Sequence, residues 1–133
     1  MILADTQALL WLDFHDERLG PETTRVATAA WGRRELAVAT ITFWEVATLL
    51  RKGRLRLMQD AQAYRTELTS LGLIELDLEG EAAAMAGAID DLHGDPADRI
   101  IVATAVLADL PLLTADERIL AWPGPLQRID ARR

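Results

Sequence analysis

The amino-acid sequence predicts an α/β fold built on a mainly parallel sheet. Short apolar segments, each the length of one buried strand, alternate along the chain with longer segments whose apolar residues have helical spacing. Half of the 133 residues are hydrophobic, which is enough for a sizeable core. Neither an internal repeat nor a long linker interrupts the alternation. We therefore expect residues 1–133 to form a single domain.

The first half of the chain predicts two buried strands and four helices. Pro21 follows a Leu-Gly pair and suits the first turn of a helix. Thr40 or Thr42 can cap the helix after the second strand, and Asp60 can cap the helix after that. The expected strands are Ile2–Ala4 and Leu36–Ala39, and the expected helices are Gln7–Leu12, Pro21–Trp31, Phe43–Lys52 and Ala61–Leu71.

The second half predicts three more strands and three more helices. Asp95 and Pro96 form a strong helix start, because aspartate is a preferred cap and proline fits the first helical position. The expected strands are Leu73–Leu78, Leu110–Thr114 and an edge strand at Leu126–Ile129, and the expected helices are Glu79–Ile89, Pro96–Leu107 and Glu117–Ala121.

The overall charge, taken alone, argues against nucleic acid as a partner. The chain carries 21 acidic and 14 basic residues, a net charge of −7, whereas phosphate contacts need Lys and Arg. This objection weakens if several carboxylates gather in one pocket to hold a divalent cation. The densest basic cluster is Arg51, Lys52, Arg54 and Arg56. We interpret it as a solvated loop in preference to an RNA contact.

Other features limit the cellular setting and the chemistry. The longest apolar segment, Ile100–Leu107, is too short to span a bilayer, and the first residues lack the basic region of a signal peptide. Without cysteine, disulfides and thiolate metal sites are excluded. We expect a cytoplasmic protein.

Four carboxylates fall where a parallel sheet binds its ligands. Asp5 follows the first strand, Glu45 lies one turn into the helix after the second, Asp98 is in the first turn of the helix opened by Asp95, and Asp116 follows the fourth strand. Ligands of such sheets bind at the carboxyl ends of the strands. We call these four residues the acidic quartet and expect them on one rim. Carboxylate oxygens are the ligands that Mg²⁺ and Mn²⁺ prefer.

Each acid taken singly also has a structural interpretation. Asp5 and Asp116 could be helix caps, and Asp98 could complement a helix dipole. Glu45 could be a solvated helix residue, although its neighbours are apolar. We assign Asp95 to capping. The quartet is more informative than its members, because four unrelated caps would not need to share one rim.

No other catalytic set is apparent. His15 and His93 both lie in polar segments, and we interpret them as surface residues. The serine elbow and the phosphate-binding Walker loop are missing. Aromatic side chains can stack on bases, but for Trp11, Trp31 and Trp44 we prefer packing in the core or in an interface.

Four segments of the chain resemble PIN-domain ribonucleases, in particular the toxin half of VapBC toxin–antitoxin pairs. The third segment is the most specific, and the four run in family order over nearly the whole chain. They are Met1–Leu12, Thr42–Ala47, Leu92–Ala105 and Leu110–Asp116.

This resemblance implies a three-layer α/β/α sandwich and a role for each acid. Asp5 and Asp98 would be the main ligands of Mg²⁺ or Mn²⁺, Asp116 would bind the ion directly or through water, and Glu45 would complete the pocket. The hydroxyls of Thr6 and Thr114 would support them. Many relatives have histidine at position 7, where this chain has Gln7, so the role of that position is open.

The resemblance also implies a function and partners. The chain would be a metal-dependent endoribonuclease toxin, a homodimer held inactive by a VapB-like antitoxin. We expect the antitoxin's basic C-terminal tail to lie near Phe43, Trp44 and the Arg51–Arg56 segment. Two alternatives remain: an RNA-processing or structure-specific nuclease outside any toxin pair, and a non-catalytic module that binds a basic peptide.

Overall fold

A five-stranded parallel sheet forms the centre of the computed structural model, which describes all 133 residues. The strand order is β3-β2-β1-β4-β5, and every neighbouring pair is parallel. The strands are β1 (Ile2–Ala4), β2 (Leu36–Ala39), β3 (Ile74–Leu76), β4 (Leu112–Thr114) and β5 (Arg128–Asp130). The α/β prediction is therefore confirmed, although β3 and β4 are shorter than expected and β5 begins two residues later than the expected edge strand.

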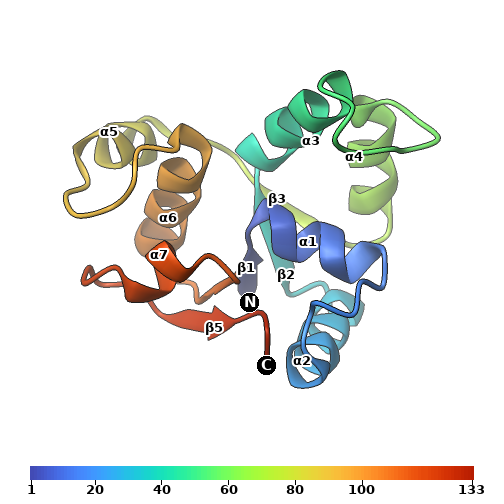
Figure 1. Cartoon of the computed structure of the whole chain (residues 1–133), viewed down its shortest axis with the longest axis horizontal. Helices are drawn as coiled ribbons and strands as arrows, with labels where there is room; N and C mark the ends of the chain where they lie inside the picture. The colour runs from blue at the N-terminus through green and yellow to red at the C-terminus, as the bar shows by residue number, and fades with distance from the viewer.

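Seven helices cover the two faces of the sheet, which gives the three layers of an α/β/α sandwich (Figure 1). Helices α1 to α4 lie on one side, and α5 to α7 lie on the other. Their bounds are α1 (Thr6–Asp13), α2 (Pro21–Gly32), α3 (Ile41–Arg51), α4 (Ala61–Ser70), α5 (Gly80–Ala88), α6 (Pro96–Ala108) and α7 (Glu117–Ala121). None of these helices has the length and apolar character needed to cross a membrane.

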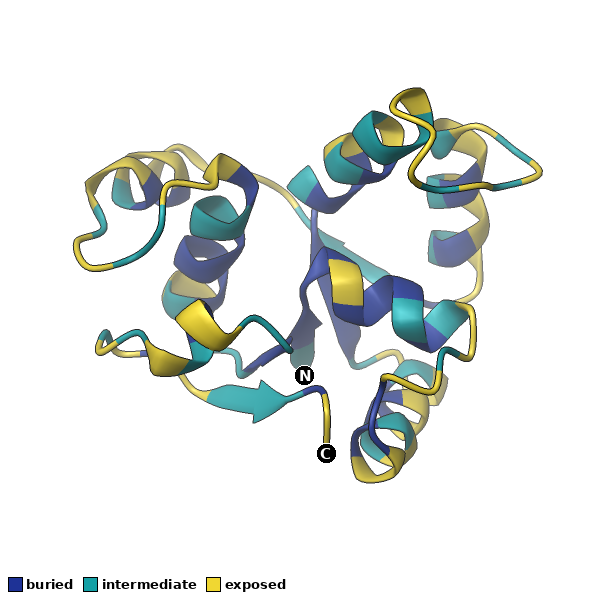
Figure 2. Ribbon diagram, viewed as in Figure 1, coloured by how far each residue is buried: buried dark blue, intermediate teal, exposed yellow.

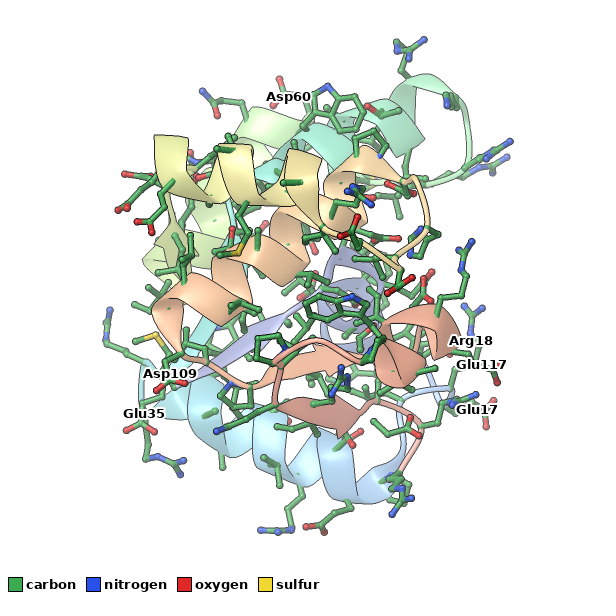
Figure 3. All side chains as sticks on the ribbon, turned by 90° about the vertical axis from the view of Figure 1, so that its left-hand side faces the viewer. Glu17, Arg18, Glu35, Asp60, Asp109 and Glu117 are labelled. Carbon is green, nitrogen blue, oxygen red and sulfur yellow. The ribbon has the colours of Figure 1, made fainter.

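The core is divided between the two faces of the sheet. One apolar cluster packs α1 to α4 on the sheet through residues such as Leu9, Val46 and Leu68, and a second packs α6 and α7 through Ile101 and Ile119. Figure 2 shows the buried residues along the strands and on the inner sides of the helices. The central strands β2, β1 and β4 are covered on both faces, which explains why they are continuous apolar segments in the sequence. Charged side chains such as Glu17, Glu35 and Asp109 lie at the outer edge of the molecule (Figure 3).

Two of the predicted helix caps are present and one is absent. Asp60 accepts a hydrogen bond from the backbone N–H of Ala63, and Asp95 accepts from those of Ala97 and Asp98. Thr40, one of the two expected candidates, lies at the cap of α3, but the expected capping hydrogen bond is absent. Thr40 occupies the cap position with helical dihedral angles, and its hydroxyl donates to Glu75 at 2.7 Å instead.

The C-terminal segment, which follows the edge strand β5, is hydrogen-bonded to the start of α2. The backbone N–H of Gly20 donates to the carbonyl of Ala131, and the hydroxyl of Thr23 donates to that of Asp130. A Cβ atom at Gly20 would lie 2.0 Å from the carbonyl carbon of Arg133. Gly20 therefore permits a close backbone approach that no other residue would allow.

Candidate active site

The order in which the chain adds strands to the sheet reverses between β1 and β4. The chain passes from β1 outward to β2 and β3, then crosses back to β4 on the other side of β1. After β1 the chain continues into α1, and after β4 it continues into α7, on the other side of the sheet. Such a reversal of strand order is called a switch point, and ligands of open α/β sheets bind at the carboxyl ends of the strands beside it. Asp5 directly follows β1, and Asp116 lies two residues after β4.

Asp5 is held in place by both of its carboxylate oxygens. Oδ1 accepts a hydrogen bond of 2.8 Å from the backbone N–H of Ala8, which caps α1, and Oδ2 accepts from the hydroxyl of Thr114. Thr114 also accepts from the backbone N–H of Asp116 at 3.1 Å. Burial raises the pKa of Asp5 to about 6, against the lowering effect of these two hydrogen bonds.

Glu45 approaches Asp5 from α3 through a pair of threonines. The hydroxyl of Thr6 donates to Oε1 of Glu45, and it lies 3.0 Å from the buried hydroxyl of Thr42. Burial raises the pKa of Glu45, and the charges of Asp95 and Asp5 raise it further. The sequence indicates Thr42 only as a possible cap, whereas the structure buries its hydroxyl against that of Thr6.

Asp98 differs from the other three acids of the quartet, whose carboxylates each accept a hydrogen bond. Its own carboxylate accepts none. It lies in the first turn of α6, which Asp95 caps. Burial raises the pKa of Asp98 to about 7, and the acidic neighbours Asp95, Glu45, Asp116 and Asp5 add to the effect in that order. Like charges held close together disfavour ionisation, so this carboxylate calls for a positive partner.

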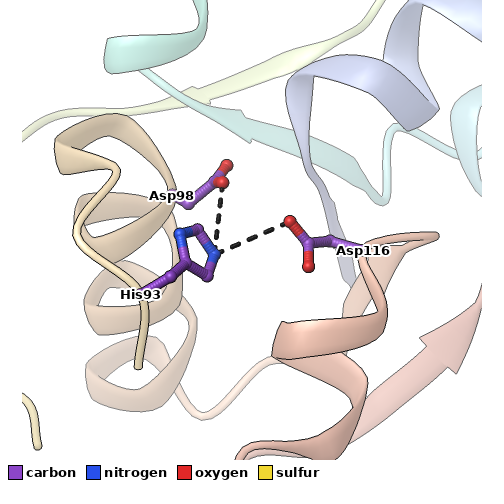
Figure 4. A group of neighbouring side chains, drawn as sticks. All are labelled: His93, Asp98 and Asp116. Carbon is purple, nitrogen blue, oxygen red and sulfur yellow. Dashed lines mark ion pairs between the residues drawn. The ribbon is translucent and has the colours of Figure 1, made fainter. Parts of the chain in front are cut away.

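His93 lies between Asp98 and Asp116 (Figure 4). Its Nε2 atom is 3.5 Å from Oδ2 of Asp98 and 3.6 Å from Oδ2 of Asp116, and its side chain is 10% exposed. The interpretation of His93 as a surface residue is therefore wrong. The sequence places His93 in a polar loop, but the ring turns back towards the start of α6.

Arg99 holds the loop that carries His93. Its guanidinium donates to the carbonyls of Ala86, Leu92, His93 and Ile89, at 2.9, 3.0, 3.3 and 2.7 Å. No role for Arg99 is apparent from the sequence, although it lies in the most specific of the four family-like segments. A single arginine thus replaces the regular hydrogen bonding that this loop lacks.

The four acids line one cleft of about 560 Å³. Asp95, which caps α6, also lines it, and two basic residues, Arg18 and Arg54, lie on its wall. Arg18 stacks over Trp11 with its guanidinium carbon 5.1 Å from the ring centre, and it also pairs with Asp16 at 2.6 Å. The cleft therefore combines an acidic floor with cationic and aromatic side chains on its wall.

The residues of the cleft fit a divalent cation. The donor set consists of carboxylate oxygens, which hard cations prefer, and the pKa values of Asp5, Glu45 and Asp98 are all raised. Asp98 and Asp116 place carboxylate oxygens within 4.8 Å of each other. A cation would offset the crowding of negative charge that raises these pKa values.

A parallel α/β/α sandwich with carboxylates gathered at its switch point is the arrangement of a PIN domain. The chain belongs to the PIN domain family, whose sequence profile matches residues 2–123. It is 30% identical over 125 residues to Ribonuclease VapC22 of Mycobacterium tuberculosis (strain ATCC 25618 / H37Rv), a match that covers 93% of each chain.

Solved structures of similar fold come from toxin–antitoxin systems. A chain of a toxin–antitoxin complex from Klebsiella pneumoniae superposes with a TM-score of 0.66 at 23% identity, with 98% of each chain covered. VapBC2 from Rickettsia felis, bound to a DNA fragment from its promoter, gives 0.69 at 14% identity, again with 98% of each chain covered. At these identities the likeness establishes the fold.

Proposed function

We propose that the chain is a metal-dependent endoribonuclease and the toxin of a VapBC-type toxin–antitoxin pair. The observation that carries this proposal is the convergence of the acidic quartet on one cleft at the switch point of the sheet. Membership of the PIN family and the similarity to a VapC ribonuclease support it. Such a toxin would act on RNA in the cytoplasm.

In this proposal Asp5 and Asp98 are the main ligands of a Mg²⁺ or Mn²⁺ ion, and Asp116 binds it directly or through water. Glu45 faces the same space and would orient the attacking water. When bound, the cation would polarise the phosphoryl group and lower the pKa of that water. Thr6 and Thr114 hold two of the carboxylates in position through their hydroxyls.

The wall of the cleft suits an RNA backbone better than the floor does. Arg18 and Arg54 are exposed and lie beside the acids, so they can contact phosphates next to the one that is cleaved. The overall charge of −7 would keep binding of nucleic acid elsewhere on the surface weak.

The antitoxin would dock beside the cleft on α3. Trp44 is 58% exposed there and offers an apolar contact. Arg51, Lys52, Arg54 and Arg56 are exposed without an ion pair and would repel the cations of a basic tail, which directs those cations towards the acidic quartet. The expectation that Trp44 packs in the core is wrong, and the alternative of an interface remains. An Arg or Lys from the partner would enter the quartet and replace the cation. The resemblance further implies a homodimer, which sedimentation measurements can test.

Cleavage assays with purified protein test the metal requirement. RNA cleavage should need Mg²⁺ or Mn²⁺ and stop when EDTA is added, because the acids would then hold no ion. Either ion should also raise the melting temperature, since a ligand of the native state stabilises it by mass action. Robust cleavage in EDTA would contradict the metal-dependent mechanism.

A growth assay separates the toxin from an RNA-processing nuclease. Expression in the native host without the neighbouring gene should arrest growth, and co-expression of the adjacent upstream reading frame should rescue it. A truncation of that partner's C-terminal tail should abolish the rescue. Normal growth of the host without the partner would favour the RNA-processing alternative.

A further inference from the structure

His93 has a buried polar atom whose function the acidic quartet does not explain. The side chain is nine-tenths buried, and Nε2 has no hydrogen-bond partner. This atom points at Asp98 on α6 and at Asp116 on the turn between β4 and α7 (Figure 4). The two distances, 3.5 and 3.6 Å, are about half an ångström longer than a hydrogen bond.

The other side of the ring determines what Nε2 can do. Nδ1 accepts a hydrogen bond of 3.4 Å from the backbone N–H of Asp95. A neutral imidazole has one donor and one acceptor nitrogen, so the proton lies on Nε2. Nε2 is therefore a donor, and it lacks the lone pair that a metal ligand needs. His93 is also absent from the residues that line the cleft, whereas both of its acidic neighbours line it.

We propose that His93 is a positioning residue that joins Asp98 and Asp116 through its Nε2–H group. This inference rests on the proposed metal-dependent function. The two carboxylates belong to separate elements and repel each other, so a donor shared between them fixes their spacing. The loop that carries the ring is itself fixed, because Arg99 binds the carbonyls of Leu92 and His93.

The spacing of the two carboxylates in turn sets the affinity for the cation. Groups that orient metal ligands without touching the ion typically contribute about 10- to 100-fold to metal affinity. Loss of the donor should therefore weaken metal binding, even though both carboxylates are still present in the protein.

The test measures Mn²⁺ binding to the full-length protein by the electron paramagnetic resonance signal of the free ion. His93→Gln keeps an N–H donor at a similar reach, whereas His93→Leu and the unbranched His93→Met lack one. We expect the two apolar variants to bind Mn²⁺ about 10-fold more weakly or worse, and His93→Gln to stay close to the wild type. His15→Asn, at an exposed histidine outside the cleft, is the matched control and should bind as the wild type does.

Several outcomes would overturn the inference. Equal Mn²⁺ affinity in all His93 variants would show that the ring does not position the acids. Coupling of bound Mn²⁺ to a histidine nitrogen, measured in the wild type by pulsed resonance, would make His93 a ligand instead. Failure of the wild type itself to bind Mn²⁺ would contradict the proposed function, so the two failures are distinguishable. Melting curves in EDTA identify any variant that does not fold, and the other apolar variant then decides.

Discussion

Asp5 and Asp116 use their two carboxylate oxygens for different purposes. In Asp116, Oδ1 accepts from the backbone N–H groups of Arg118 and Ile119 and so caps α7, while Oδ2 faces His93. In Asp5, Oδ1 caps α1 and Oδ2 receives the hydroxyl of Thr114. A capping role and a place in the cleft are therefore compatible in one residue. The structural and functional interpretations of these acids are not alternatives.

This division predicts the effect of amide substitutions. Asp5→Asn and Asp98→Asn should abolish cleavage and the stabilisation by Mg²⁺, because each removes a charged oxygen. The fold should survive, because Asn at position 5 caps α1 nearly as well as Asp does, and the cap of α6 is Asp95 and not Asp98. Cleavage assays and melting curves of the purified variants measure both effects. Asp60→Asn makes the same change at the cap of α4 and should leave activity intact. Full activity of Asp98→Asn would reduce that residue to a purely structural role.

The raised pKa values predict how stability depends on pH without metal. Asp5 and Asp98 titrate at about 6 and about 7 in the native state, against about 3.9 for an unfolded aspartate. Between these values the native state binds more protons than the unfolded state does, so stability falls as the pH rises from about 4 to about 7.

Melting temperatures in EDTA should therefore decrease across this range, and saturating Mg²⁺ should reduce the decrease because the cation takes over from the protons. Asp98→Asn should flatten the metal-free curve, which separates the local effect from the general effect of net charge. A melting temperature in EDTA that is constant or increases with pH would contradict this explanation.

At the scale of elements, the helices that carry the acids are positioned by contacts at their ends. Helix α1 begins at the cap formed by Asp5, and α6 begins at the cap formed by Asp95. Helix α2 instead has a glycine cap, Gly20, with no side-chain hydrogen bond. The helix begins at Pro21, as the sequence predicts. The backbone contact of Gly20 with the C-terminal segment holds this start in place, and the local sequence does not predict that contact.

Two glycine substitutions at opposite ends of α2 should have opposite effects on the stability of the protein. Gly20→Ala places a methyl group against the backbone of Arg132 and Arg133, and should lower the free energy of unfolding by about 1–3 kcal/mol. Gly32→Ala, at the last residue of α2, meets nothing within 4 Å, and should raise it by roughly 0.5–1 kcal/mol. Urea unfolding of both variants gives the two values. Equal stability of the two variants would mean that the close approach at Gly20 is unimportant.

At the scale of the whole molecule, charge and apolar surface are unevenly distributed around the cleft. The acids form its floor, whereas Trp44 and the exposed basic residues of Arg51–Arg56 lie on or directly after α3. A partner that bears both cations and apolar anchors would match the cleft and the exposed tryptophan together. This pattern is the structural reason for placing the antitoxin there.

Binding measurements with the purified antitoxin test this placement. Trp44→Ala should weaken binding about 30-fold or more, because a central tryptophan of an interface typically contributes about 2 kcal/mol or more. The association rate should fall as salt increases, since opposite charges steer the encounter. Leu107→Ala removes an exposed apolar side chain near the far end of α6 and is the matched control. An equal loss in both variants would contradict the proposed docking surface.

The sequence by itself determined the α/β class, the order of the strands and helices, and the Asp60 and Asp95 caps. These features depend on local periodicity and on contacts within three residues, which the sequence displays directly. It also singled out the four acids that line the cleft, because the position of each relative to a strand end or helix start is local too.

Only the tertiary structure shows which distant residues several side chains contact and how exposed they are. The sequence could not show that His93 turns towards Asp98 and Asp116, that Thr42 lies beside Thr6, or that Gly20 meets the C-terminal backbone. Nor could it show that Trp44 is exposed. Each of these facts depends on which distant segments pack together, and the residues next to a position in the sequence do not determine that packing.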